Sequence, residues 1–248
     1  MILTSKNNPL VKETATLKDK KGRKELGLFL VEGIKMTREA LKSGLEVERI
    51  FLSETCKEKD FPVEKTVVVS DEVMKHLCDE KTPQGVLCRV KIPVKKTESP
   101  KSACLILDGV ADPSNVGAII RTANASGYKE IYMTPDCADA YAPKSVRASM
   151  SGVFFTEIYT ISREEIPAVM LGVPVLVADM GGKNVFTYAP PEKFALVIGN
   201  EGRGVSTEVR GLATDVIKIP MRETQESLNA SVSAGILMYL LKKRDFLE

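Results

Sequence analysis

Residues 103–121 read ACLILDGVADPSNVGAIIR, and this stretch decides the fold class. Its apolar run Ala103–Leu107 predicts a strand buried on both faces, and the pattern from about Asn115 to Ser126 predicts the helix that follows. Further strands are predicted at Glu130–Met133, Pro174–Ala178, Phe194–Ile198 and Asp215–Ile219, and a long last helix near Asn229–Lys243. Strands of this kind, separated by helices, indicate an α/β domain with a mostly parallel sheet. Ligands of such sheets bind beyond the carboxyl ends of the strands.

The residues before this stretch predict a smaller α/β domain. Its strands are expected at Leu28–Val31, Val47–Leu52, Val67–Val69 and Gly85–Val90, with helices after Gly33 and Ser70. A polar, proline-flanked segment then predicts a linker. We therefore divide the chain into an N-terminal arm at 1–24, a first domain at 25–91, a linker at 92–101 and a second domain at 102–248.

The charge of the chain is distributed unevenly. Its 35 lysines and arginines exceed its 33 acidic residues by only two, too few to indicate a nucleic-acid binder. Residues 1–24, however, carry seven cations and two carboxylates, namely Lys6, Lys12, Lys18, Lys20, Lys21, Arg23 and Lys24 against Glu13 and Asp19. Such a basic arm suits a polyphosphate partner. The alternative is an ordinary solvated helix face.

Cysteine and histidine usage gives no sign of a metal site. The five cysteines never form a C-x-x-C pair, and the single histidine, His76, lies within a predicted helix. We therefore expect free thiols and no metal. No apolar run approaches the ~20 residues needed to cross a membrane, and the first 24 residues lack the apolar core of a signal peptide. These features predict a cytoplasmic protein without a membrane partner.

Three polar loops follow predicted strands of the second domain. In the first, Asn115 and Arg121 are separated by nearly two helical turns, so we expect both on roughly one face. The alternative is an asparagine that caps the helix and a surface arginine. In the second loop, Gly199, Gly202 and Gly204 allow a ligand to approach the main chain. The glycine spacing is not the dinucleotide pattern G-x-G-x-x-G, and Glu201 would repel a pyrophosphate.

The third loop runs from Ile219-Pro220-Met221 to Ser227-Leu228-Asn229-Ala230-Ser231. Either Ser227 or Asn229 could simply cap the last helix. If the sheet is parallel, however, all three loops lie at one edge.

Together these loops resemble the three sequence motifs of the SpoU/TrmH family of RNA ribose 2′-O-methyltransferases, in the SPOUT superfamily. The matching segments are Asn115-x-Gly117-x-x-x-Arg121, Gly199-Asn200-Glu201-Gly202 and the third loop quoted above, in the family's order. The first domain is similar to the family's substrate-binding domain at Phe29–Gly33 and Thr82–Val86. The resemblance therefore spans nearly the whole chain.

The resemblance implies a fold, a cofactor and a set of site residues. The fold is a C-terminal SPOUT domain with a deep trefoil knot, preceded by a smaller α/β RNA-binding domain, and the protein is a homodimer with active sites at the subunit interface. S-adenosyl-L-methionine is the implied cofactor, with contacts at Gly199, Ile219, Met221 and Leu228. The implied catalytic residues are Arg121, Asn115, Glu201, Ser227 and Asn229.

Arginine is normally charged at any attainable pH, so Arg121 is either a true base or an electrostatic clamp for the developing alkoxide. The implied acceptor is a ribose 2′-hydroxyl, which DNA lacks, so the implied substrate is RNA. The expected RNA contacts are Lys6, Lys12, Lys20, Lys21, Arg23, Lys24 and Arg147.

Ribosomal RNA is the expected substrate because the chain has a separate N-terminal recognition domain. Transfer RNA is the nearest alternative. A non-catalytic RNA-binding module of the same fold is a second, and a nucleotide-dependent oxidoreductase, which lacks the required glycine spacing, is a third.

Overall fold

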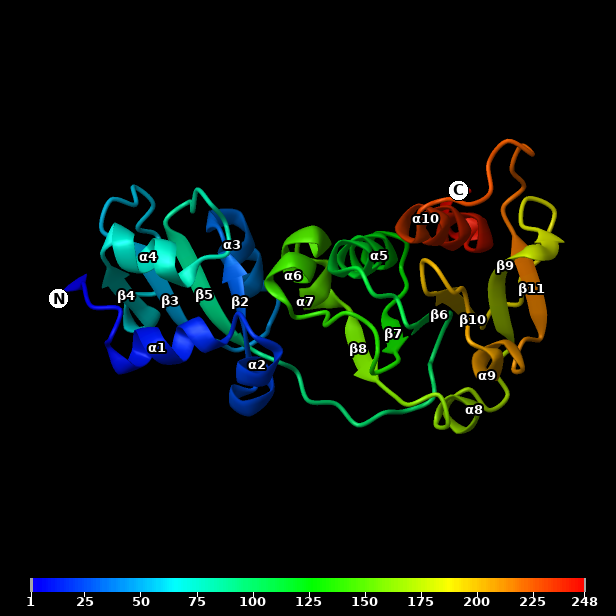
Figure 1. The fold of residues 1–248 in the computed structure, drawn as a ribbon, viewed down its shortest axis with the longest axis horizontal. Helices are drawn as coiled ribbons and strands as arrows, with labels where there is room; N and C mark the ends of the chain where they lie inside the picture. The colour runs from blue at the N-terminus through cyan, green and yellow to red at the C-terminus, as the bar shows by residue number, and fades with distance from the viewer. Residues whose placement is uncertain (1, 248) are drawn as a thin grey trace.

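The structure, a computed structural model, describes residues 2–247 as two α/β domains that lie side by side along the longest axis (Figure 1). The first domain contains a five-stranded mixed sheet in the order β1-β4-β3-β5-β2. The strands are β1 (Ile2–Leu3), β2 (Leu28–Glu32), β3 (Val47–Ser53), β4 (Thr66–Val69) and β5 (Val86–Lys91). β1, β4 and β3 are parallel to one another, whereas β5 runs antiparallel to both of its neighbours. The predicted strands of this domain are confirmed, and β1 is an addition.

The helices of the first domain are α1 (Pro9–Thr16), α2 (Lys20–Leu26), α3 (Ile34–Lys42) and α4 (Asp71–Leu77), with a 3₁₀ turn, η1, at Val63–Lys65. As the sequence predicts, Gly33 precedes α3, and the Ser70 side chain caps α4 by accepting from the amide of Val73. The segment predicted as a basic arm is folded onto this domain. β1 pairs with β4, and Val11 and Leu17 are buried with Phe51 in the core.

The second domain contains a six-stranded sheet, parallel throughout, in the order β11-β9-β10-β6-β7-β8. The strands are β6 (Cys104–Asp108), β7 (Glu130–Met133), β8 (Glu157–Thr160), β9 (Val175–Asn184), β10 (Ala195–Gly199) and β11 (Asp215–Lys218). The helices are α5 (Pro113–Ala125), α6 (Pro143–Ser149), α7 (Gly152–Phe155), α8 (Ile166–Val169), α9 (Thr207–Arg210) and α10 (Ala230–Leu241), followed by the 3₁₀ turn η2 (Lys243–Phe246). The predicted parallel α/β fold is confirmed. The trefoil knot stays a prediction.

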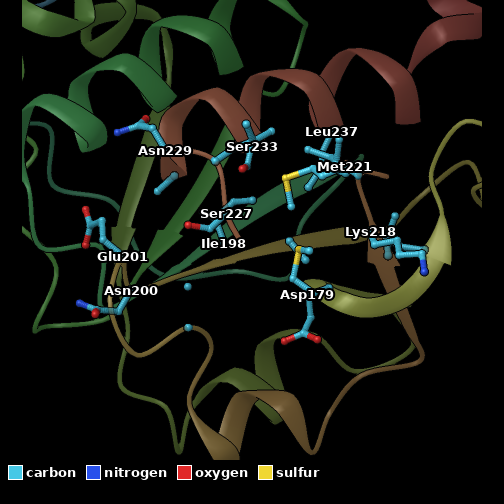
Figure 2. Close-up of a pocket in the computed structure, with 18 residues that line it drawn as sticks. Asp179, Ile198, Asn200, Glu201, Lys218, Met221, Ser227, Asn229, Ser233 and Leu237 are labelled. Atoms are coloured by element: carbon cyan, nitrogen blue, oxygen red, sulfur yellow. The ribbon is translucent and has the colours of Figure 1, made fainter. Parts of the chain in front are cut away.

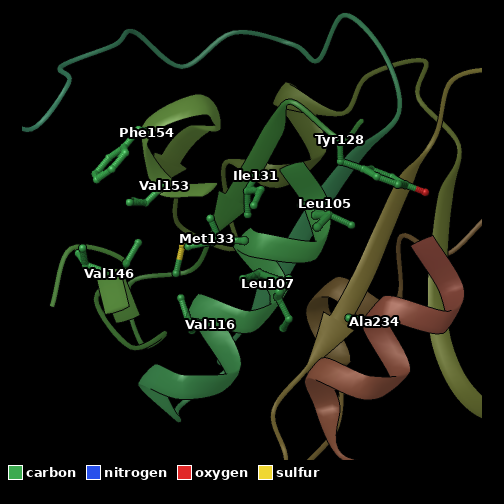
Figure 3. Packing of buried hydrophobic residues seen from close by; sticks show 14 of the residues in the cluster. Leu105, Leu107, Val116, Tyr128, Ile131, Met133, Val146, Val153, Phe154 and Ala234 are labelled. Carbon is green, nitrogen blue, oxygen red and sulfur yellow. The ribbon is translucent and has the colours of Figure 1, made fainter. Parts of the chain in front are cut away.

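Helices cover both faces of this sheet, with α5 and α10 on one side and α8 and α9 on the other (Figure 1). Leu105 and Leu107 face the first pair of helices, where they pack with Val116 and Ala234 (Figure 3). Cys104 and Ile106 belong to a second cluster, on the opposite face. Alternate residues of β6 are therefore buried on alternate faces, which explains its uninterrupted apolar sequence.

Ion pairs and aromatic contacts join the two domains. Arg23 of α2, only 4% exposed, binds Asp139 at 2.7 Å. Arg147 of α6 pairs with Asp79 at 3.1 Å and with Glu80 at 2.8 Å. The rings of Phe29 and Tyr141 lie 4.9 Å apart. Along the linker, Lys95 pairs with Glu157. The first domain is therefore held against the second by side chains as well as by the chain itself.

Candidate active site

A cavity of about 380 Å³ lies between the ends of β10 and β11, the middle of β9 and the first turns of α10. Figure 2 shows Asn200 and Glu201 on one side of it and Asp179 and Lys218 on the other, with Ser227 between them. Its volume falls within the usual range for small-molecule sites. The cavity therefore occupies the position at which parallel sheets bind ligands.

The glycine loop, residues 199–206, forms one wall of this cavity. Gly199 ends β10, and a β-carbon at this position would lie 2.4 Å from the carbonyl carbon of Gly204. Asn200 and Gly204 exchange two main-chain hydrogen bonds of 2.9 Å, which close the loop. The side chain of Asn200 donates to the carbonyl of Gly109 at 2.7 Å. Gly199 is therefore required by close packing within the loop.

Glu201 connects the glycine loop to the segment before α5. Its carboxylate accepts from the main-chain amides of Ala111 at 3.0 Å and Asp112 at 3.1 Å, and from the Asn115 side chain at 2.9 Å. Partial burial favours a higher pKa, but these hydrogen bonds outweigh it and hold the pKa of Glu201 below its usual value. Glu201 is consequently ionised at neutral pH and fixes Asn115.

Asn115 also binds the third loop. Its side-chain oxygen accepts from Asn229 at 3.0 Å. Asn229 is the N-cap of α10, accepting from the amides of Ser231 and Val232, as one of the alternatives for this residue predicts. The corresponding alternative for Asn115 is wrong, because Asp112 caps α5. One hydrogen-bonded chain, Glu201–Asn115–Asn229, therefore joins all three motif segments.

The four residues expected to contact the cofactor all line the cavity: Gly199, Ile219, Met221 and Leu228. Glu201, Ser227 and Asn229 line it as well. Asp179, Lys218, Ser233 and Leu237 also do so and were not predicted. Asp179 binds Arg210 at 2.7 Å, and this hydrogen bond, with one from the amide of Gly181, holds its pKa below the usual value. No motif in the sequence marks Asp179, because the predicted strand ended at Ala178.

Arg121 does not line this cavity. An α-helix turns by about 100° per residue, so six residues separate Arg121 from Asn115 by ~120° around the axis. Asn115 is buried, whereas Arg121 is exposed. Within residues 2–247, no side-chain hydrogen bond or ion pair holds its guanidinium. The expectation that the two residues share a face is therefore wrong.

The residues expected to bind RNA fall into three groups. Lys12, Lys20, Lys21 and Lys24 are exposed on the first domain. Lys6 is exposed and pairs with Glu72 at 2.8 Å. Arg147 and Arg23 bridge the domains, and Arg23 also donates to the carbonyls of Leu17 and Lys18. The expectation for Arg23 is wrong, because its guanidinium is buried and occupied by protein groups.

Across residues 2–247, no group of three or more acidic, cysteine or histidine side chains is placed to hold a metal ion. In the same part of the chain, no helix has the length and apolar character needed to span a membrane.

Comparisons with known proteins give a consistent result. Residues 102–239 match the model of the SpoU rRNA Methylase family, and residues 8–88 match that of the MRM3-like substrate binding domain. The chain is 30% identical to the 23S rRNA (guanosine(2553)-2′-O)-methyltransferase RlmP of Bacillus subtilis, covering 97% of this chain and 98% of that protein. It is 28% identical to the 23S rRNA (adenosine(1067)-2′-O)-methyltransferase of Streptomyces laurentii, covering 98% and 96%.

Among solved structures, an AdoMet-bound rRNA methyltransferase from Sinorhizobium meliloti superposes with a TM-score of 0.89 at 26% identity. That match covers 100% of this chain and 99% of the other. The family model covers more than half of the chain, and the fold and the three loops agree with it. The chain belongs to the SpoU rRNA methylase family.

Proposed function

We propose that this protein transfers a methyl group from S-adenosyl-L-methionine to a ribose 2′-hydroxyl of ribosomal RNA. The observation that carries the proposal is the hydrogen-bonded chain Glu201–Asn115–Asn229, which joins the first motif segment to the two segments that line the cavity. Two relatives of nearly the same length are named as 23S rRNA 2′-O-methyltransferases, which supports the same substrate class.

The cavity suits this cofactor chemically. Apolar surface for a nucleoside comes from Ile198, Met221, Leu228 and Leu237. The glycine loop and the third loop, which also line the cavity, offer main-chain groups. Two lining residues, Glu201 and Asp179, are acidic and one, Lys218, is basic, and this balance disfavours a pyrophosphate. Bound S-adenosyl-L-methionine supplies an electrophilic methyl group carried on a sulfonium. Gly199, Ile219, Met221 and Leu228 would hold it.

The chain's own residues have to orient the ribose and accept the proton lost from its hydroxyl. Asn115 and Asn229 are fixed by Glu201, so their amide groups are preorganised beside the cavity. Arg121 is exposed and does not line the cavity of its own subunit. We assign Arg121 to the active site of a second copy of the chain, where its guanidinium would stabilise the developing alkoxide.

A homodimer is supported by the surface around Arg121. α10 is apolar on its outer face as well as on its buried one, with Val232 and Tyr239 exposed. Met150 and Phe155, next to α5, are also exposed. Large apolar side chains gathered on one face are typical of a protein interface. We therefore propose that a second copy covers this face, with the Arg121 of each copy acting in the active site of the other.

RNA would be attracted by the exposed lysines of the first domain, Lys12, Lys20, Lys21 and Lys24.

The cytoplasmic location and the domain limits expected from the sequence stay predictions.

The proposal is tested by transfer of a labelled methyl group to ribosomal RNA and to transfer RNA. Ribosomal RNA should accept the label, and alkaline hydrolysis should leave a resistant dinucleotide at the modified position. Mapping ribose methylation in cells with and without the gene identifies the nucleotide. Labelling of transfer RNA only would favour the alternative substrate. Failure to bind the cofactor at millimolar concentration, with or without RNA, would favour a non-catalytic module.

A further inference from the structure

Arg163 is bound to a fully buried carboxylate on the far side of the glycine loop from the cofactor cavity. Asp108, the last residue of β6, is 1% exposed. Arg163 lies in the segment after β8, and its Nη2 and Nε approach Asp108 Oδ1 at 2.6 and 2.8 Å. Arg163 also reaches Asp136, beyond β7, at 2.9 Å. One guanidinium therefore ties together the carboxyl ends of three strands.

The same network holds both ends of the glycine loop. At its far end, the amide of Ser206 donates to Asp108 Oδ2 at 2.6 Å, and the hydroxyl of Ser206 lies 3.2 Å from Arg163 Nε. At its near end, Asn200 donates to the carbonyl of Gly109, the residue after Asp108. The loop is thus attached at both ends to Asp108 and its neighbour.

The loop is a thin wall between two cavities. On one side, Gly199, Asn200, Glu201 and Gly204 line the cofactor cavity. On the other, a cavity of about 250 Å³ is lined by Asn200 and Gly204 together with Asp108 and Arg163. Because a cavity lies behind the loop, its hydrogen bonds to Asp108 and Gly109 support it from that side.

We propose that Arg163 is a positioning residue for cofactor binding, which acts by neutralising Asp108 so that this carboxylate can anchor the glycine loop. A buried carboxylate without its cation is strongly unfavourable, so loss of Arg163 forces Asp108 to move toward water or to take up a proton. Either change weakens its hold on Ser206. The displacement reaches Glu201 through the loop, and from Glu201 it reaches Asn115. This inference rests on the proposed function.

The test compares three single variants with the wild-type full-length protein. Arg163→Ala removes the cation. Arg163→Lys keeps a charge beside Asp108 but loses the fork that reaches Asp108, Ser206 and Asp136 together. Asp136→Asn removes the outer ion pair and leaves Asp108 paired. Calorimetry measures the dissociation constant for S-adenosyl-L-methionine, and steady-state assays measure kcat and the KM for RNA, well below each variant's unfolding temperature.

We expect Arg163→Ala to weaken cofactor binding by about tenfold or more while the KM for RNA changes by less than about threefold. Arg163→Lys should fall between Arg163→Ala and the wild type, and Asp136→Asn should stay within about twofold of the wild type. If Arg163→Ala does not fold, the cofactor affinities of Arg163→Lys and Asp136→Asn decide the question.

The proposal would be overturned if Arg163→Ala or Arg163→Lys folds, melts at a lower temperature and binds the cofactor with unchanged affinity. Arg163 would then have a purely structural role. The proposal would also be overturned if Asp136→Asn loses as much cofactor affinity as the arginine variants, since the ion pair between Arg163 and Asp136 would then account for the loss. If the wild type itself binds no cofactor, it is the proposed function that fails.

Discussion

Asn229 donates a hydrogen bond of 3.0 Å to Asn115, a residue 114 positions earlier in the chain. Asn115 in turn donates to Glu201 at 2.9 Å. Each amide therefore has its orientation fixed by the next group, and the chain ends on an ionised carboxylate held by main-chain amides. A linked arrangement of this kind should respond to mutation as a unit.

Alanine substitutions at Asn115 and Asn229 should be non-additive. Each single variant should weaken cofactor binding, and the double variant should lose less than the sum, with a coupling energy of about 0.5–1.5 kcal/mol. Calorimetry on the four proteins of a double-mutant cycle measures it. Asn124→Ala, an exposed asparagine on the same helix, serves as the control and should match the wild type. Strict additivity would mean that the two amides act independently.

Glu201 should contribute to stability only when it is ionised. Its pKa is lowered in the folded protein, so its contribution is complete above its ordinary value of 4.5 and is lost as the pH falls through the lower, folded pKa. Glu201→Gln places an amide NH₂ group against the main-chain amides that the carboxylate accepts from. This variant should therefore unfold at lower denaturant concentration than the wild type at pH 7, and the difference should shrink in acid. Equal midpoints at pH 7 would contradict this account.

Arg121→Ala should abolish methyl transfer and leave cofactor affinity within several-fold of the wild type, because Arg121 does not line the cofactor cavity of its own subunit. A mixing experiment tests its action across a dimer. When Arg121→Ala and Glu201→Ala proteins exchange subunits, half of the dimers are mixed, and each mixed dimer holds one intact site if Arg121 acts in trans. Activity should then recover to about a quarter of the wild-type value. An inactive mixture, with subunit exchange verified, would indicate action within one subunit.

The sequence predicted most of the second domain because its strands are buried on both faces, which produces continuous apolar runs such as that of β6. β8 was missed because it lies at the sheet edge, where Glu157 and Thr160 interrupt the pattern. β9 extends beyond Ala178 through Gly181 and Gly182, residues that usually end a strand. A β-carbon at Gly182 would lie 2.5 Å from Val216, a contact with a strand distant in sequence. Only the folded chain reveals why glycine is needed there.

The sequence predicted those site residues whose roles leave a recognisable local pattern. The glycine loop and the cap of α10 carry such signals, so Gly199 and Asn229 could be found. The prediction that Arg121 shares a face with Asn115 was wrong because the six-residue separation was treated as two full helical turns. Arg23 was misassigned because its charge was counted without its burial, which depends on Asp139 in the other domain.

Substitution of Arg23 should lower the stability of the protein far more than substitution of its neighbour Lys24. Arg23→Ala removes a buried cation from Asp139 and from two main-chain carbonyls, so it should lower the free energy of unfolding by about 3 kcal/mol. Lys24→Ala, at an exposed position one residue along, should change it by less than ~0.5 kcal/mol. Urea unfolding of both variants measures the difference. Similar midpoints for the two proteins would show that the ion pair does not hold the domains together.

The exposed lysines of the first domain should set the salt dependence of RNA binding. Deleting residues 1–24 would remove β1 and expose the core around Val11 and Leu17, so substitution is the better test. Replacing Lys12, Lys20 and Lys24 with alanine should weaken RNA binding at low salt. For every lysine that neutralises a phosphate in the wild type, its replacement should flatten the plot of log affinity against log salt by about 0.7–0.9.

The matched control replaces Lys96, Lys101 and Lys129, which are also exposed but lie on the linker and second domain. Both triple variants lower the net charge by the same amount, so a general electrostatic effect would change their slopes equally. A flatter slope for the first-domain variant alone identifies this surface as the one that contacts the RNA backbone. Equal slopes in the two variants would instead mean that charge anywhere on the protein is enough.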